Sequence, residues 1–352
     1  MIARLGTVAL VAAIAGCAIA GPASIRGGRL AYNEAIIATN DQQMLAMIVR
    51  MRYGESTGLL AVSSITASMA IQASVGGQVG IGSSSSYEGN LVPLSVGASY
   101  EENPTISYAP VQGEEYMRQV LSPLPIDLTV LVLGARRGDP HALTFLVQGI
   151  NGIRNPALLA GSVGADPRFA RVAELVAGMG GDDEVQWTTD KSGHVLVLRC
   201  GGENLPPRAR ELFDILGIAP PEPTAGIITL PVVLGIGRPR EPAIHLDTRS
   251  LWELFQIAAS SVDVPQADIE SRTAPPLPPQ GPAGQSIRIR RAKKAPDSAV
   301  TAVRRGDWWY YIEGTDAESK VTFRILENLM SVRMADSVGK QAAPVLTIPA
   351  SR

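Results

Sequence analysis

The sequence of 352 residues predicts an α+β fold of mixed helices and antiparallel strands, with a long amphipathic β-hairpin and a small C-terminal β-rich unit. Three observations lead to this class. Apolar residues recur at helical spacing in several segments. Two long runs alternate strictly between apolar and polar residues around a polar tip, and a further alternating segment follows a proline-rich break near the C-terminus.

The composition excludes several classes of protein. Because 45% of the residues are hydrophobic and 18% are charged, the chain can bury a core and is not disordered along its whole length. A formal net charge of −2 argues against a nucleic-acid partner, which would call for a large basic excess. Two cysteines and three histidines are too few for a disulfide framework or a multi-ligand zinc site, so no metal or other cofactor is expected.

The first residues have the pattern of a signal peptide. Arg4 precedes an uncharged stretch of 11 residues, 5–15, which is too short to cross about 30 Å of hydrocarbon. The stretch runs into IAGC, which resembles the bacterial lipobox and implies cleavage before Cys17 and lipidation of its thiol. Several acyl chains would anchor the protein stably. Ala18, by resemblance to the sorting rules of lipoproteins, favours the outer membrane. The alternative is an ordinary secretory signal with a chance cysteine.

These patterns divide the chain into five parts. They are a lipoprotein signal peptide (1–16), a tether (17–28), a main α+β domain (29–264) that includes the hairpin 60–108, a Pro-rich linker (265–285) and a C-terminal ββαβ unit (286–352). With Cys17 acylated, Cys200 has no intramolecular partner, and its place at the end of an alternating run predicts a buried structural thiol.

Element signals follow in order along the mature chain. Asn40 is the expected N-cap of a first helix that ends at Gly54. Further helices are expected at 113–121, 126–135, 140–149, 167–179, 207–216, 248–260 (with Asp247 as its cap) and 316–334. Strands are expected at 184–188, 194–199, 226–234 and 243–247, in a hairpin over 299–313, and in the final PVLTIP.

The segment from Leu60 to Tyr108 is the most patterned part of the sequence. A tip at 83–90 makes Gly82 face Leu91, and this register places all apolar residues of the two strands on one face. The candidate membrane-facing residues are Val75, Val79, Ile81, Val92, Leu94, Val96, Ala98 and Tyr100. The strands 73–82 and 91–100 have ten residues each, and a tilted membrane-spanning strand needs about 9–11.

Two interpretations of this hairpin stay open. A single hairpin has unpaired edges and cannot lie in lipid, so insertion would need at least about four copies that contribute eight strands to one barrel. The alternative is an amphipathic hairpin that covers the helices of its own chain, as is common in soluble proteins.

No catalytic residues emerge from the sequence. Neighbouring acidic residues point apart, and His141 and His245 have no partner at metal-ligand spacing. GGQVGIG is not a phosphate-binding motif. Arg288, Arg290, Arg291, Lys293 and Lys294 form a basic run that is expected at a solvated sheet edge, with anionic lipid headgroups as the alternative contact.

Four of the 17 aromatic residues are consecutive. Alternation sends Trp308 and Tyr310 to one face of a strand and Trp309 and Tyr311 to the other, so half are expected in the core and half at the surface. These four residues are the candidate surface for a protein partner.

Several stretches, read together, resemble a family of uncharacterised lipoproteins from Gram-negative bacteria. They include NEAIIATNDQQMLAMIVRMRYGE, ENPTISYAPVQGEEYMRQVLSP, HLDTRSLWELFQIAASSVDVP and RRGDWWYYIEGTDAESKVTFRILENLM. The resemblance covers nearly the whole mature chain. It implies export and lipidation, and it supplies no catalytic residues because no activity is assigned to that family.

The leading hypothesis is a non-enzymatic outer-membrane lipoprotein that faces the periplasm, with a structural, assembly or export role and self-association through the hairpin 65–108. A second hypothesis is a monomeric, periplasm-facing adaptor that binds an envelope partner through its C-terminal unit. A third, and the weakest, is an envelope hydrolase whose distant polar residues meet in one cleft.

Overall fold

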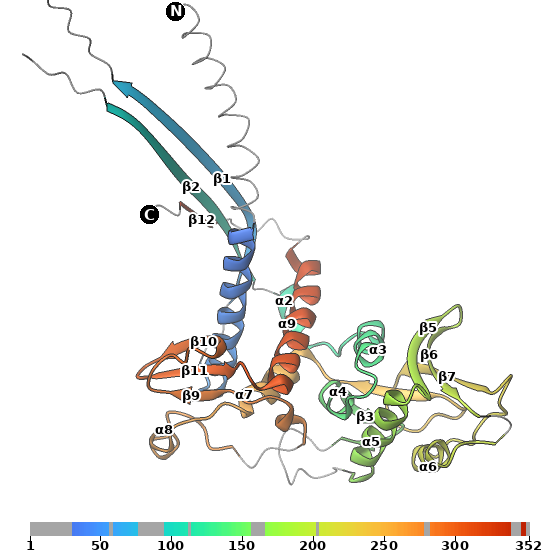
Figure 1. Ribbon diagram of the computed structural model, residues 1–352. Helices are drawn as coiled ribbons and strands as arrows, with labels where there is room; N and C mark the ends of the chain where they lie inside the picture. Colours follow the sequence, from blue (N-terminus) through green and yellow to red (C-terminus); the bar gives the residue numbers. More distant parts are fainter. Residues whose placement is uncertain are drawn as a thin grey trace, which may run out of the picture. The chain divides into compact units, whose positions relative to one another are not determined.

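The computed structural model describes residues 30–55, 59–76, 95–111, 114–155, 166–201, 204–277, 282–338 and 346–349 (Figure 1). It confirms the mixed α+β class. The chain divides into two compact units, Met1–Gly58 with Gln112–Ser337, and Leu59–Val111 with Val338–Arg352. Among the described helices, none combines the length and the hydropathy needed to cross a membrane.

A six-stranded mixed sheet is the centre of the first unit. Its strands are β3 (Val147–Ile150), β4 (Ile153–Arg154), β5 (Val185–Asp190), β6 (Gly193–Arg199), β7 (Ile227–Leu234) and β8 (Ile244–Thr248), in the order β4-β3-β8-β7-β6-β5. Neighbouring strands are antiparallel except β7 and β8. Alternation buries one side of β7, where Ile228, Leu230 and Val232 enter the core, and exposes the residues between them.

The other elements around this sheet are helices, and all of them except α8 contribute buried residues to the core. They are α2 (Glu114–Leu121), α3 (Ile126–Ala135), α4 (Pro140–Leu146), α5 (Arg168–Gly181), α6 (Pro207–Leu216), α7 (Leu251–Ser260) and α8 (Gln266–Glu270). Helix α5 is typical, because Phe169, Val172, Val176 and Met179 are buried at helical spacing. Helices α3 and α5 both contact β5, so both stripes pack on the sheet.

The sequence places most of these elements within a few residues, with three corrections. Residues 147–149 form β3 instead of extending α4, because Val147 and Gly149 pair with β8. Ser250, not Asp247, caps α7 through a capping box with Glu253. The first helix is already formed at residue 30 and runs to 52, so Asn40 lies exposed within it and is not its N-cap.

The first unit also contains a second, three-stranded antiparallel sheet. Its strands are β9 (Arg290–Ala292), β10 (Ala299–Arg305) and β11 (Trp308–Glu313), in the order β10-β11-β9, and the expected hairpin over 299–313 is present. Gly306 has a φ of 58°, which suits the tight turn between β10 and β11. Helix α9 (Ala317–Val338) is bound to the N-terminal helix by two hydrogen bonds from Arg324 to Asp41.

The proline-rich segment 265–285 belongs to the first unit and does not separate two units. It contains α8 and the 3₁₀ helix η1 (Pro282–Ser286). Ala274 and Ala283 are completely buried, so small side chains pack there although apolar periodicity is absent. The boundaries drawn from the sequence therefore differ from the division that the contacts give.

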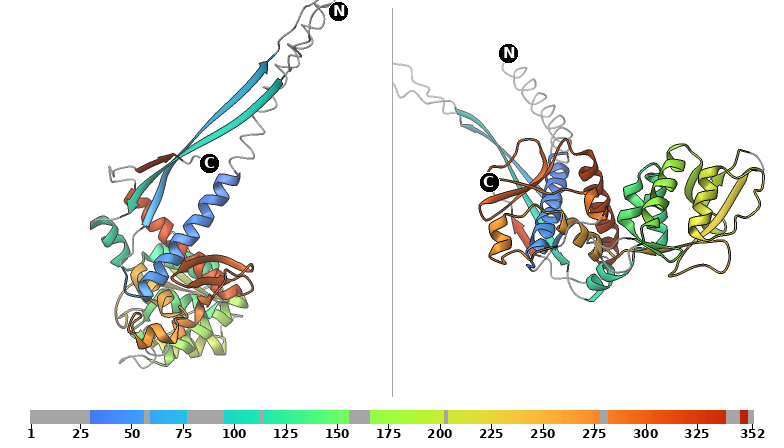
Figure 2. Two further views of the ribbon diagram at one scale, coloured as in Figure 1. Left: turned by 90° about the vertical axis from the view of Figure 1, so that its left-hand side faces the viewer. Right: turned by 90° about the horizontal axis from the view of Figure 1, so that it is seen from below.

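The second unit is a three-stranded antiparallel sheet of β1 (Leu59–Gly76), β2 (Ser95–Val111) and β12 (Leu346–Pro349), in the order β1-β2-β12. Figure 2 shows β1 and β2 twisting along their length. The final strand thus pairs with β2, not with the C-terminal sheet to which the sequence assigned it.

The register of the hairpin differs by two residues from the predicted one. Val75 pairs with Val96 instead of Ala98, and Ile71 pairs with Tyr100. A shift of two keeps every residue on its predicted face, because strand periodicity is two. The pairing also extends to 18 and 17 residues, well beyond the ten expected per strand. The tip, with Val79, Ile81, Val92 and Leu94, lies outside the described residues.

Candidate functional site: an aromatic and basic surface

The aromatic run occupies β11 at the centre of the C-terminal sheet. Tyr310 is 1% exposed and belongs to the core, so it cannot contribute to a partner surface. Trp308, Trp309 and Tyr311 are each partly exposed. The candidate partner surface therefore reduces to these three side chains, and we call them the aromatic surface.

Two cations lie over the ring of Trp308. Lys293 Nζ is 3.8 Å and Arg291 Cζ is 4.7 Å from the ring centroid. Cation–π contacts at exposed sites contribute about 0.5–1 kcal/mol each. Arg291 Nε lies 3.0 Å from Asp263 Oδ2, whereas none of the described ion pairs includes Lys293. The surface therefore combines an indole ring with a positive charge that has no carboxylate partner among the described residues.

The basic run lies along an outer edge of the same sheet. β9 pairs with β11 alone within the three-stranded sheet, and Arg288 and Arg290 are exposed beside it. β9 is therefore an end strand of this sheet, as the sequence predicts, although Ile289, between Arg288 and Arg290, forms a parallel bridge with Val262. Charged side chains at a sheet edge discourage pairing with another strand. Binding of anionic headgroups by these residues stays a prediction.

A hydrogen-bond network of two tyrosine hydroxyls and one carboxylate lies beneath the aromatic surface. Tyr53 Oη donates to Asp268 Oδ2 over 2.7 Å and lies 2.6 Å from Tyr310 Oη. Because the single proton of Tyr53 goes to the carboxylate, Tyr310 is the donor of the second bond. The two rings meet edge to face, with centroids 6.3 Å apart. This hydrogen-bond network thus holds β11 against the end of the N-terminal helix.

The two tyrosine hydroxyls of this network have a structural role. Burial, followed by the bonds to Tyr310 and Asp268, raises the pKa of Tyr53 far above its ordinary value. Burial also raises the pKa of Tyr310. Arg305 lies 3.3 Å above the centroid of the Tyr53 ring and forms an ion pair with Glu55. Both phenols stay protonated at neutral pH, so neither can act as a base.

Cys200 and His194, two other residues with reactive side chains, have structural environments. Cys200 is 8% exposed, and burial raises the pKa of its thiol, in agreement with the structural thiol that the sequence predicts. The ring of His194 contacts the hydroxyl of Thr189. The described residues hold no group of three or more potential metal ligands.

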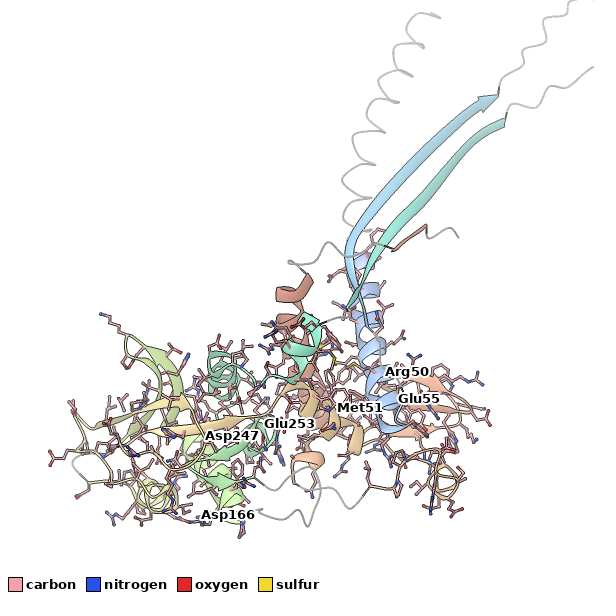
Figure 3. All side chains as sticks on the ribbon, turned by 180° about the vertical axis from the view of Figure 1, so that it is seen from behind. Arg50, Met51, Glu55, Asp166, Asp247 and Glu253 are labelled. Carbon is pink, nitrogen blue, oxygen red and sulfur yellow. The ribbon has the colours of Figure 1, made fainter. Side chains whose placement is uncertain are left out.

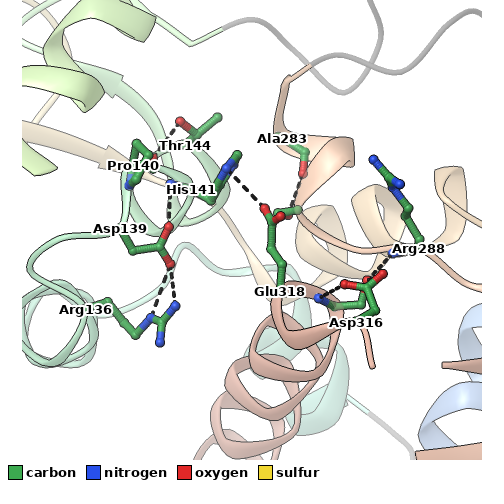
Figure 4. Close-up of polar contacts among 11 residues, drawn as sticks. Arg136, Asp139, Pro140, His141, Thr144, Ala283, Arg288, Asp316 and Glu318 are labelled. Atoms are coloured by element: carbon green, nitrogen blue, oxygen red, sulfur yellow. Dashed lines mark hydrogen bonds and ion pairs between the residues drawn. The ribbon is translucent and has the colours of Figure 1, made fainter. Parts of the chain in front are cut away.

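His141 also has a structural environment. Asp139 caps α4 by accepting from the His141 backbone N–H at 2.9 Å, and Arg136 pairs with the same carboxylate. The imidazole Nε2 lies 3.1 Å from Glu318 Oε1, in the first turn of α9 (Figure 4). These contacts join α4 and α9.

Of the remaining candidate residues, some lie within the described residues and others do not. Cys17 lies outside the described residues, as does the hairpin tip. Val75, Val96, Ala98 and Tyr100 lie in paired stretches of β1 and β2. Tyr53 and Asp268 were not anticipated, because they are 215 residues apart and neither belongs to a motif.

Comparison with known proteins leaves the family open. No protein-family model matches the chain, and neither the curated proteins nor the solved structures contain a significant match. The resemblance to bacterial lipoproteins stays a prediction.

Proposed function

We propose that this protein is an outer-membrane lipoprotein that faces the periplasm and has a non-enzymatic structural, assembly or export role, exercised by self-association through the hairpin β1–β2. Lipidation of Cys17 would provide the anchor, as the IAGC pattern implies. The observation that carries the proposal is the outer edge of β1, which pairs with no strand among the described residues.

Strand β1 is an edge strand along its entire length. Within the described residues it pairs with β2 alone, from Leu59 to Gly76. On the opposite edge of β2, the described residues of β12 pair only with Thr105–Tyr108. Unpaired strand edges present rows of backbone donors and acceptors that template pairing with another chain.

The length of the hairpin adds to this argument. At about 3.3 Å per residue, an 18-residue strand extends for roughly 60 Å. A two-stranded ribbon is marginally stable by itself in water. Pairing with hairpins of further copies would satisfy the open edges. Closure of these hairpins into one barrel would turn the face that contains positions 75 and 96 toward lipid or detergent.

Self-association can be tested with matched substitutions on the two faces. Val75 pairs with Val96, and the adjacent pair, Ser74 with Gly97, lies on the opposite face. We expect V75K/V96K to convert an oligomer in mild detergent to a monomer, since each lysine would lie on the face turned toward lipid or detergent. S74K/G97K should remain oligomeric. Native mass spectrometry of the full chain gives the readout, and a monomeric wild type would contradict the proposal.

A Cys17→Ser variant tests the anchor independently. Loss of the lipid-modified mass and release from the membrane fraction are expected. A variant that remains in the membrane fraction would show that another feature attaches the chain.

The second candidate function is a monomeric adaptor that binds through the aromatic surface. The partly exposed rings of Trp309 and Tyr311 favour it. So does Lys293, which lies over the ring of Trp308 and has no ion-pair partner among the described residues. In that case removal of residues 73–100 would leave partner binding unchanged, whereas Trp309→Ala would weaken it. Pull-down from envelope extracts with both variants separates the two functions.

A further inference from the structure

A small pocket lies in the first unit, at the end of the N-terminal helix. Its volume is about 220 Å³, and its lining includes Met51, Arg52, Gln256, Ala259, Pro275 and Leu277. Three segments distant in sequence form it: the last turn of the N-terminal helix, α7, and the proline-rich stretch after α8. Figure 3 shows Met51 beside Arg50 on the N-terminal helix.

Arg52 is the only charged residue among the described residues of this lining, and it is 7% exposed. Its Nη1 donates to the Pro275 carbonyl over 2.7 Å. Its Nε is buried and has no hydrogen-bond partner among the described residues. None of the described ion pairs includes Arg52, whereas Arg305 pairs with Glu55 and Arg324 with Asp41.

The placement of Arg52 follows from its helix. Leu45, Ile48 and Arg52 occupy one buried stripe, at spacings of three and four residues. The guanidinium of Arg52 therefore lies at a helix position where an apolar side chain would ordinarily pack. Burial without a carboxylate lowers the pKa of Arg52, which means that an anion placed beside it would be favourable.

We propose that this pocket binds a small monocarboxylate with an apolar chain, of about five to eight carbons. A guanidinium presents a planar edge that matches a carboxylate with two parallel hydrogen bonds. Met51, Ala259, Pro275 and Leu277 would contact the chain. An apolar cavity of about 150 Å³ accommodates benzene, so the larger volume of this pocket suits a molecule of this size.

The charge of the lining favours a carboxylate over a phosphate. One cation can neutralise one negative charge, whereas a phosphate near neutral pH carries more than one. The described residues of the lining include no second cation. Gln256 adds a neutral polar group that can bond the second oxygen of a carboxylate.

Methionine-methyl NMR of the full chain in amphipol tests this proposal, because Met51 lines the pocket. Hexanoate should shift the Met51 resonance saturably, whereas hexan-1-ol and inorganic phosphate at the same concentration should not. Arg52→Gln should weaken hexanoate binding at least about tenfold, as loss of a charge-assisted bond predicts. Arg50→Gln is the matched control, since Arg50 is exposed and outside the lining, and it should bind as the wild type does.

A second variant covers the case in which Arg52→Gln does not fold. Ser260, the part-exposed last residue of α7, also lines the pocket, and Ser260→Leu would fill it and keep the charge. This variant should lose the hexanoate shift as well. Equal binding of hexanoate and hexanol, wild-type affinity in Arg52→Gln or Ser260→Leu, or no saturable shift in the wild type would each overturn the proposal.

Discussion

Two regions of the first unit handle buried charge in opposite ways. Where the N-terminal helix meets α9, the carboxylate of Asp41 is 5% exposed and accepts two hydrogen bonds from Arg324, at 2.6 and 2.7 Å. At the junction of β8 and α7, Arg249 is 2% exposed, and its Nε and Nη2 have no hydrogen-bond partner among the described residues. A buried charge therefore has a direct partner in one region and only distant ones in the other.

The difference shows which buried charges hold the fold together. Burial lowers the pKa of Arg249, and Asp247 and Glu253 only partly oppose this effect through longer-range attraction. Such a charge costs free energy in the folded state. In the Asp41–Arg324 pair, two charge-assisted hydrogen bonds offset the free energy of desolvation. Removal of one partner therefore lowers the free energy of unfolding.

The largest expected effect comes from breaking the paired region. Arg324→Met leaves Asp41 buried without its cation and should lower the free energy of unfolding by about 3 kcal/mol. The same substitution at Arg249 is the matched comparison, and it should change stability by less than about 1 kcal/mol because no direct ion pair is lost. Urea unfolding of both variants measures the contrast. Equal losses would contradict the distinction between the two regions.

An intermediate effect is expected in the hydrogen-bond network beneath the aromatic surface. Tyr53→Phe removes the acceptor of Tyr310 and the donor to Asp268 together, and should cost about 1–3 kcal/mol. Tyr310→Phe leaves the Tyr53–Asp268 bond intact and should cost about 1 kcal/mol. Thermal unfolding gives the order of the two variants. A larger loss in Tyr310→Phe would mean that ring packing, not the hydrogen bonds, dominates.

The smallest effect concerns pH and the unpaired region. Burial, assisted by the charge of Glu253, raises the pKa of Asp247. The folded state therefore holds a proton more readily than the unfolded chain, and stability falls as the pH rises from the unfolded value through the raised folded one. Asp247→Asn should remove this loss, with a gain of about 0.5 kcal/mol or less at pH 7, because water screens the half-buried carboxylate.

Comparison of unfolding at pH 3 and pH 7 checks the sign of this effect. The gain of Asp247→Asn should vanish at the lower pH, where the wild-type carboxyl is protonated in both states. A gain that persists at pH 3 would assign the effect to packing.

Residue patterns located most elements because their periodicity is local. The helix 126–135 and the helix 207–216 begin and end as expected, since their apolar stripes and flanking prolines are signals within the segment. For residues 147–149 the sequence pattern predicts a helix, because a short apolar run fits either element. Only the pairing with β8 makes this segment a strand.

The candidate site was predictable in part. The run Trp308–Tyr311 and the basic residues before it were apparent as patterns, and alternation was consistent with a buried Tyr310. Tyr53, Asp268 and the pocket at Arg52 were not apparent, because each depends on segments more than 200 residues apart along the chain.

By itself the sequence determined the class of fold, the faces of the hairpin and the order of most helices and strands, because periodicity and turn chemistry act over a few residues. Only the tertiary structure decided the hairpin register, the pairing of β12 with β2 and the neighbours of each buried charge. The physical reason is the same in each case. A two-residue slip preserves every local preference, and a buried arginine has the same sequence signal with or without a carboxylate beside it.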